Sequence, residues 1–203
     1  MKKFFSGKTV LVTGATGLIG SNLVDTLMKI EGIKVIALSF TEEKLKKCFE
    51  KYREKDNFRY IVRDISLGID DIEETIDVCF HGAGSMEREV ISNRPVDVIL
   101  PNLIGTKNCC EFMVSQYKKK NVKGRIILFS SVTVYGNNTD KDLIVKEEDT
   151  NYTEVLDSNS ACYSQSKRMV EVIAHAYKKQ FDVDFVTARL STCLLYTSDA
   201  ADE

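Results

Sequence analysis

The sequence contains no apolar run that could cross a bilayer, which takes about 20 consecutive residues. Its first residues, Met-Lys-Lys-Phe-Phe, resemble the start of a signal peptide. Gly7 and Lys8 interrupt that stretch before an apolar segment of signal length develops. We therefore expect neither a signal peptide nor a membrane partner.

An excess of charge of either sign is also missing. The chain has 28 Lys and Arg against 30 Asp and Glu, a formal net charge of −2, and the two signs are interspersed. Nucleic-acid-binding and membrane-surface proteins usually carry a basic patch. We expect neither of these partners, whereas a small neutral or anionic ligand remains open.

The spacing of a zinc site is absent too. The cysteines show no C-x-x-C pattern and no suitably spaced histidine partners; they stand at positions 48, 79, 109, 110, 162 and 193. We expect no metal site, and we interpret these cysteines as reduced and buried in a cytoplasmic protein. With 203 residues, 43% of them hydrophobic, the chain can form one large domain with a substantial core.

The most informative stretch runs from Val10 to Gly20, where an apolar segment gives way to Gly14, Gly17 and Gly20. We predict a strand, a phosphate-binding turn and a helix. Gly14 would take the tight turn, Gly17 would let the backbone approach a pyrophosphate, and Gly20 would let the helix pack closely on the strand. The amino terminus of that helix would face the phosphates with unpaired N–H groups and the positive end of its dipole.

Strand and helix patterns alternate along the rest of the chain. We expect helices over residues 18–30, 41–55, 95–116 and 162–180, the second capped by Thr41, and strands over residues 34–38, 58–62, 78–81, 125–129 and 184–189. This alternation predicts an α/β fold, a doubly wound parallel sheet of the Rossmann type with strand order 3-2-1-4-5-6. Residues 137–160 are polar and aperiodic, which is typical of a functional lid or substrate loop.

The end of the second strand bears on the choice of dinucleotide. In such folds an acidic residue there commonly binds the adenosine ribose hydroxyls, and a nearby arginine accommodates a 2′-phosphate. This sequence has Ser39, Phe40 and Thr41 at that place. We expect NAD because no arginine is present, and NADP is not excluded.

Tyr163 and Lys167 lie four residues apart on one expected helix, so their side chains share a face. A nearby cation lowers the pKa of a phenol from about 10, which lets the tyrosine exchange a proton with a substrate hydroxyl near neutral pH. Ser131, at the end of the fifth strand, could donate a hydrogen bond to the same oxygen. The alternatives are that the pair covers a solvated helix face and that Ser131 caps a turn.

Several short segments occur together in a fixed order. They are Thr13-Gly-x-x-Gly-x-x-Gly20, Asp64-Ile65, His81-Gly-Ala83, Asn102 before Gly105-Thr106, Ser130-Ser131-x-x-x-Tyr135-Gly136 and Tyr163-x-x-x-Lys167. As a set, from residue 8 to about residue 191, they resemble the extended branch of the short-chain dehydrogenase/reductase superfamily. Within it, they are similar to the NAD-dependent epimerase/dehydratase group that acts on nucleotide sugars.

The resemblance implies a role for each segment. Ser131, Tyr163 and Lys167 would be catalytic. The residues implied to contact or support the cofactor are Gly14, Thr16, Gly17, Leu18, Ile19, Gly20, Asp64, Ile65, His81, Ala83, Asn102 and Lys167. Among these, Asp64 and Ile65 would contact adenine, although Asp64 could instead cap a turn and Asn102 could be an ordinary helical residue. The resemblance also implies a nucleotide-sugar substrate and a homodimer of the full-length protein, formed by the helices near 96–116 and 162–180.

The reaction within the group depends on the two residues after Ser131. In 4,6-dehydratases of the group Asp and Glu stand there, and decarboxylases usually keep the Glu, whereas this sequence has Val132 and Thr133. Oxidation and reduction at the sugar C4 need only the catalytic trio, so we expect a 4-epimerase acting on a UDP- or dTDP-sugar. The segments around Asn102 and Tyr163 are also similar to relatives of UDP-glucuronate decarboxylases. A dehydratase or decarboxylase, an NADPH-dependent sugar reductase and a non-catalytic dinucleotide-binding regulator remain alternatives, the last disfavoured by the intact trio.

Residues 193–203 do not resemble the group, whose members continue past the sixth strand into a substrate-binding portion. Their sequence, Cys-Leu-Leu-Tyr-Thr-Ser-Asp-Ala-Ala-Asp-Glu, matches the in-frame translation of a transposase adapter used to build sequencing libraries. We therefore expect residues 1–192 to be the dinucleotide-binding domain of a longer enzyme, inactive without its substrate-binding portion, and residues 193–203 to be translated adapter.

Overall fold

The computed structural model of the chain describes residues 2–84, 88–136, 144–149 and 160–191. Its strands are β1 (Thr9–Thr13), β2 (Lys34–Ser39), β3 (Phe58–Val62), β4 (Val78–His81), β5 (Arg125–Ser131) and β6 (Asp184–Leu190). They form one six-stranded sheet in the order β3-β2-β1-β4-β5-β6, with every neighbouring pair parallel. The predicted α/β fold and strand order are confirmed.

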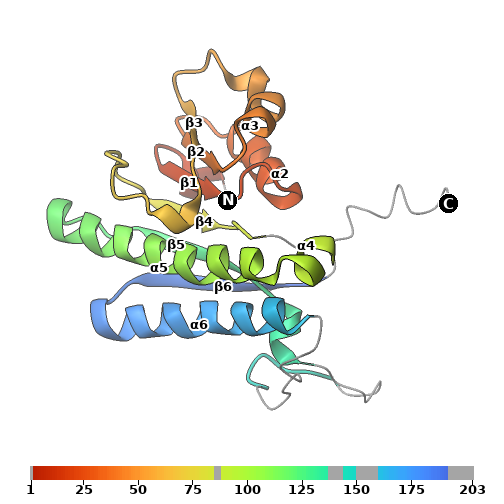
Figure 1. The fold of residues 1–203 in the computed structure, drawn as a ribbon. Coiled ribbons are helices and arrows are strands. Elements are labelled where there is room, and N and C mark those ends of the chain that lie inside the picture. Colours follow the sequence, from red (N-terminus) through yellow and green to blue (C-terminus); the bar gives the residue numbers. More distant parts are fainter. Residues whose placement is uncertain (1, 85–87, 137–143, 150–159, 192–203) are drawn as a thin grey trace.

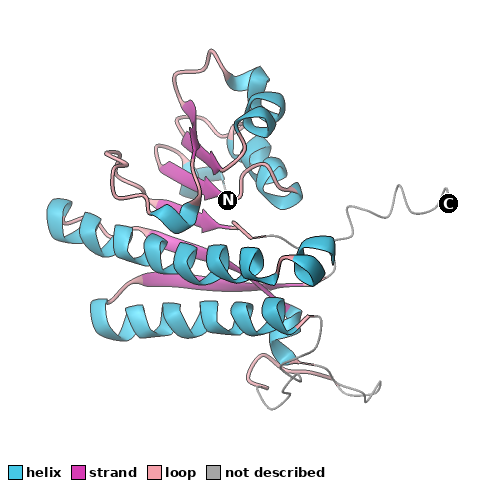
Figure 2. Cartoon of the chain, viewed as in Figure 1, coloured by secondary structure: helices cyan, strands magenta, loops and turns pink. Residues whose placement is uncertain are grey.

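Helices cover both faces of this sheet (Figure 1, Figure 2). The helix α2 (Leu18–Leu27) and the helix α3 (Glu42–Phe49) contribute to one core cluster, whereas α5 (Pro95–Lys120) and α6 (Ala161–Phe181) contribute to the other. The sequence patterns did not predict the short helices α1 (Lys2–Phe5) and α4 (Arg88–Asn93), nor the 3-10 turns η1 (Glu50–Tyr52), η2 (Ile65–Leu67) and η3 (Val132–Tyr135). The two layers of helices explain why the strands read as continuous apolar runs.

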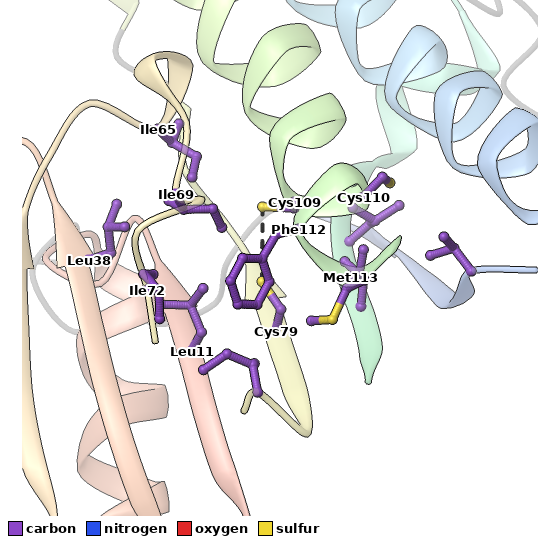
Figure 3. Close-up of a cluster of buried hydrophobic side chains, with 14 of the residues drawn as sticks. Leu11, Leu38, Ile65, Ile69, Ile72, Cys79, Cys109, Cys110, Phe112 and Met113 are labelled. Atoms are coloured by element: carbon purple, nitrogen blue, oxygen red, sulfur yellow. Dashed lines mark hydrogen bonds between the residues drawn. The ribbon is translucent and has the colours of Figure 1, made fainter. Parts of the chain in front are cut away.

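The side chains of strand β2 contribute to both core clusters, one on each face of the sheet. Val35 and Ala37 belong to the cluster under α2 and α3, and Ile36 and Leu38 belong to the cluster under α5 and α6. Figure 3 shows the second cluster, which includes Leu38, Ile69, Ile72 and side chains of α5. Because successive side chains of a strand point to opposite faces, one apolar run fills both layers.

Helix boundaries differ from the expected ones where apolar periodicity is weak. The first helix ends at Leu27 rather than near residue 30, and the second ends at Phe49 and continues as η1. Thr41 occupies the N-cap position of α3, but its side chain makes no capping hydrogen bond. The helix α5 continues to Lys120, because its last turn is a run of lysines that complements the helix dipole.

The carboxyl ends of the parallel strands meet at one edge of the sheet. Thr13, the last residue of β1, pairs with Leu38 of β2 and with His81 of β4, so the glycine turn lies between the ends of these strands. Most of the polar loop expected at 137–160 lies outside the described residues. Among the helices that the structure describes, none combines the length and apolarity needed to cross a membrane.

The cysteines are free thiols, as expected, wherever the structure describes them. Cys79, Cys109 and Cys110 are buried, whereas Cys48 and Cys162 are only half-buried, which departs from the expectation of burial. Cys193 lies outside the described residues.

Candidate functional site

Two of the three glycines in the turn after β1 are required by close packing. Gly14 has φ +65°, and a Cβ there would lie 2.5 Å from the carbonyl oxygen of Gly82. A Cβ on Gly20 would lie 2.3 Å from the carbonyl oxygen of Gly14. Gly14 therefore makes the tight turn and Gly20 brings α2 onto it, as predicted, so that the turn is held between β4 and α2.

Gly17 has a different environment. It is the N-cap of α2, it is exposed, and a Cβ on it would meet only the carbonyl oxygen of Gly14, at 3.3 Å. The first N–H groups of a helix have no partner within the helix, and here they belong to Leu18, Ile19 and Gly20. An open glycine followed by unpaired N–H groups at the positive end of a helix dipole fits the pyrophosphate of a dinucleotide.

Thr16 and Ser39 join the turn to the end of β2. The Oγ1 atom of Thr16 lies 2.8 Å from the Oγ of Ser39, and the N–H of Ala15 donates to the carbonyl of Leu38 at 3.1 Å. Ser39 is buried. The shape of the turn is therefore fixed from the β2 side as well as from the β4 side.

Asp64 and Ile65 lie at the end of β3. The carboxylate of Asp64 accepts a hydrogen bond from the N–H of Ser66 at 2.8 Å and so caps η2, the alternative that the sequence left open for it. Ile65 is buried, and a Cβ on Gly105 would lie 2.8 Å from its side chain. These contacts fix the β3 edge of the site, and contact with adenine stays a prediction.

His81, at the end of β4, is buried, and its contact with the cofactor stays a prediction. Its Nδ1 is 2.8 Å from the Oγ1 of Thr13, and the same hydroxyl accepts from the N–H of Ala83 at 3.3 Å. Burial, assisted by the charge of Lys167, lowers the pKa of His81 to about 3, so the imidazole is neutral at physiological pH. Through Thr13, His81 holds the backbone of Ala83 in place.

Asn102 connects α5 to the turn of α6 that carries the catalytic candidates. Its Nδ2 donates to the carbonyl of Val98 at 3.0 Å and to the Oγ of Ser166 at 2.9 Å, and Ser166 in turn donates to the carbonyl of Tyr163 at 2.9 Å. The Oδ1 of Asn102 is buried with no partner among the described residues, and it faces Gly84. Asn102 therefore links α5 to the turn of α6 that carries Tyr163, and its support of the site stays a prediction.

The structure brings Ser131, Tyr163 and Lys167 together. Ser131 ends β5, and the Nζ of Lys167 lies 5.8 Å from the centre of the Tyr163 ring. Lys167 donates to the carbonyl of Phe129 at 2.8 Å, and burial lowers the pKa of its ammonium to about 8. All three side chains are buried. Ser131 also accepts from the N–H of Thr133 at 3.2 Å, so it caps η3 in addition to its hydrogen bond with the phenol of Tyr163.

The pKa of Tyr163 corrects the expectation drawn from its spacing to Lys167. Burial raises the pKa of the phenol, and the hydrogen bond with Ser131 opposes this rise without overcoming it. The ammonium of Lys167 donates to the carbonyl of Phe129 instead of to the phenol. In the protein alone the phenol is therefore harder to ionise than a tyrosine in water, and lowering its pKa requires further positive charge nearby.

The sequence reasoning missed an ion pair next to the trio. Arg189 of β6 donates to both carboxylate oxygens of Glu171 on α6, at 3.0 and 2.8 Å. Ser130 donates to the same carboxylate at 2.6 Å, and Arg189 donates to the hydroxyl of Tyr135 at 2.9 Å. In the sequence, the signal that could have pointed to Glu171 was its position four residues after Lys167. The network ties together the elements that carry Ser131, Tyr163 and Lys167.

We expect Arg189→Met to lower the free energy of unfolding by about 2–4 kcal/mol, because it leaves the carboxylate of Glu171 buried without its cation. The side chains of this pair are 24% and 14% exposed. Urea unfolding of the 203-residue chain measures the effect. The control is Arg125→Met, which breaks the Arg125–Asp184 pair between β5 and β6, 45% and 42% exposed, and should cost less than about 1 kcal/mol. Equal losses in the two variants would contradict the prediction.

The model of the NAD dependent epimerase/dehydratase family matches residues 10–199. UDP-glucuronic acid decarboxylase 6 of Arabidopsis thaliana is 30% identical over 191 residues, which are 93% of this chain and 52% of that protein. UDP-glucuronic acid decarboxylase 1 of Danio rerio is 28% identical over 185 residues, 90% of this chain and 41% of that protein.

A solved structure with a similar fold is UDP-glucuronic acid 4-epimerase from Bacillus cereus, in complex with UDP-glucuronic acid and NAD. It is 24% identical with a TM-score of 0.71, and the match covers 89% of this chain and 55% of that one. The chain thus spans about half the length of the relatives that it matches.

Proposed function

This chain belongs to the NAD-dependent epimerase/dehydratase family, and from that premise we propose that the complete protein is a nucleotide-sugar 4-epimerase. The observation that carries the proposal is that Ser131, Tyr163 and Lys167 lie together at the carboxyl edge of the sheet. The two residues that follow Ser131, Val132 and Thr133, cannot act as an acid or a base. We further propose that residues 1–192 are the dinucleotide-binding part of a longer enzyme and that residues 193–203, which lie outside the described residues, are translated adapter.

The residues at this edge fit the NAD on which the family depends. In our proposal the N–H groups that follow Gly17 bind the pyrophosphate, Ala83 lines the groove, and Lys167 binds the nicotinamide ribose. The orphaned Oδ1 of Asn102 beside Gly84 adds a buried acceptor to the same region. NAD bound there would supply a hydride acceptor for oxidation at the sugar C4 and, once reduced, a hydride donor for the resulting ketone.

Tyr163 moves the proton in this scheme. Its phenolic oxygen takes the proton of the C4 hydroxyl during oxidation and gives it back during reduction, while Ser131 donates a hydrogen bond to the same sugar oxygen. Lys167, with a pKa of about 8, remains mainly protonated near pH 7 and stabilises the phenolate. Inversion at C4 then requires the intermediate ketone to present its other face.

The residues after Ser131 argue against elimination. A dehydratase needs a group that protonates a leaving hydroxyl and a group that abstracts a carbon-bound proton. Val132 is exposed and apolar, and the Oγ1 of Thr133 is buried with no partner among the described residues. Neither side chain titrates near neutral pH, whereas C4 oxidation and reduction need only the trio.

Similarity to UDP-glucuronic acid decarboxylases, at 30% and 28% identity, favours a second candidate reaction. Oxidation of UDP-glucuronate at C4 places a ketone β to the carboxylate, and such a β-keto acid loses carbon dioxide readily. This reaction uses the same trio, so Tyr163 and Lys167 serve both candidates.

The test incubates the complete enzyme with UDP-glucose, UDP-galactose and UDP-glucuronate. NMR follows the C4 configuration, and absorbance follows reduced cofactor. We expect inversion at C4 without net consumption of NAD, because the hydride leaves and returns. Release of carbon dioxide from UDP-glucuronate would favour the second candidate. Formation of a 4-keto-6-deoxy sugar, or stoichiometric oxidation of NADPH, would contradict both.

We also propose that the complete protein is a homodimer that pairs through α5 and α6. These helices lie side by side over the β4–β6 half of the sheet (Figure 1). They carry exposed apolar side chains at helical spacing, namely Val96, Leu100 and Ile104 on α5 and Met169 and Val172 on α6. Exposed apolar side chains gathered on neighbouring helices support an interface there.

A further inference from the structure

The end of β2 is where dinucleotide-binding folds usually select their cofactor. An acidic residue about 20 positions beyond the glycine turn accepts hydrogen bonds from the adenosine ribose hydroxyls. In this chain that place is taken by Ser39, the last residue of β2. Because β2 lies between β1 and β3, Ser39 is flanked by the glycine turn on one side and by Val62 on the other.

The hydroxyl of Ser39 already has a hydrogen-bonding partner within the glycine turn. This hydroxyl lies 2.8 Å from the hydroxyl of Thr16, and the residue is 5% exposed. The residue that follows, Phe40, is 76% exposed and carries no charge. A pair of neutral hydroxyls therefore stands where an anionic carboxylate would otherwise be.

The charged side chains near the end of β2 do not take the place of the acidic residue that usually stands there. Glu42, in the first turn of α3, pairs with Lys46 at 2.7 Å. Arg63, at the end of β3, forms a two-pronged ion pair with Asp71 and so has its own counter-ion. The helix α3 as a whole begins with two glutamates and carries three lysines, so neither sign dominates there.

We propose that Ser39 and Thr16 form a neutral ribose subsite that discriminates weakly between NAD and NADP. This inference rests on the proposed function, since it requires a dinucleotide at the glycine turn. A carboxylate accepts from the 2′-hydroxyl and repels a 2′-phosphate, whereas a hydroxyl both accepts and donates and bears no charge. The pair is thus suited to either form of the cofactor.

The test measures binding, so it can use the 203-residue chain itself. Calorimetric titration with NAD and with NADP should give dissociation constants within about tenfold of each other. Ser39→Asp should shift the ratio by a further ~30-fold or more in favour of NAD, because it places a negative charge beside the 2′-phosphate. The control is Ser6→Asp, which adds the same charge to an exposed serine just before β1, at the opposite edge of the sheet, and should leave the ratio unchanged.

Thr16→Ala provides a second variant, because a carboxylate at the buried Ser39 position can itself impair folding. It removes one hydroxyl without adding charge, so we expect both dissociation constants to rise by a similar few-fold factor. A wild-type chain that binds NAD more than about 100-fold more tightly than NADP would overturn this inference and leave the proposed function standing. Failure to bind either dinucleotide would overturn both.

Discussion

Tyr163→Phe in the complete enzyme is expected to reduce kcat by about 10²–10⁴-fold while leaving NAD affinity nearly unchanged. Phenylalanine retains the ring that packs against Val90 and Val98, so the variant loses only the hydroxyl that exchanges the proton. Steady-state turnover of a UDP-sugar gives kcat, and calorimetric titration gives the dissociation constant of NAD.

Tyr177→Phe is the matched control for this experiment. Tyr177 lies on the same helix, and its hydroxyl contacts Glu111 at 3.2 Å, away from the trio. This variant should keep wild-type turnover. If Tyr163→Phe also kept it, the proton would have to be carried by another group, and the proposed role of Tyr163 would be wrong.

Gly20→Ala is expected to lower the free energy of unfolding by about 3 kcal/mol, because its methyl group would lie 2.3 Å from the carbonyl oxygen of Gly14 and 2.9 Å from the Cα of Ala15. Both obstacles are backbone atoms, which cannot turn aside as a flexible side chain can. Urea unfolding of the 203-residue chain measures the loss.

Gly17→Ala should show the opposite pattern. Its methyl group would meet only the carbonyl oxygen of Gly14, at 3.3 Å, so we expect stability within about 1 kcal/mol of wild type. The same methyl group stands in the space through which a pyrophosphate approaches the helix end, and NAD affinity should fall by about tenfold or more. Wild-type stability of Gly20→Ala, or wild-type NAD affinity of Gly17→Ala, would contradict the division of roles between the two glycines.

Much of the fold could be predicted because parallel strands buried on both faces leave a strong pattern. The bounds expected for β3 and β4 agree with the observed Phe58–Val62 and Val78–His81. The last turn of α5 was missed because its lysines carry no apolar periodicity. The short helix α4 and the 3-10 turns are too brief to leave a periodic signal.

The candidate site was predictable only where its residues are close in sequence. Tyr163 and Lys167 are one helical turn apart, and their spacing pointed to a shared face. Arg189 contacts Glu171 and Tyr135 across separations of 18 and 54 residues, which no local pattern encodes. The predicted direction of the Tyr163 pKa shift was wrong for a related reason. It depends on burial, which is a property of the assembled fold.

The contact between the glycine turn and β4 also has a consequence for the order of folding. Thr13 contacts His81 and Ala83 across 68 and 70 residues, and Gly14 packs against Gly82. The contacts that shape the turn from the β4 side are therefore absent until β4 has joined the sheet. During synthesis from the amino terminus, the segment that contains the glycine motif leaves the ribosome well before the strand that shapes it. We therefore expect the glycine turn to reach its observed conformation late in folding, because that conformation depends on a non-local contact.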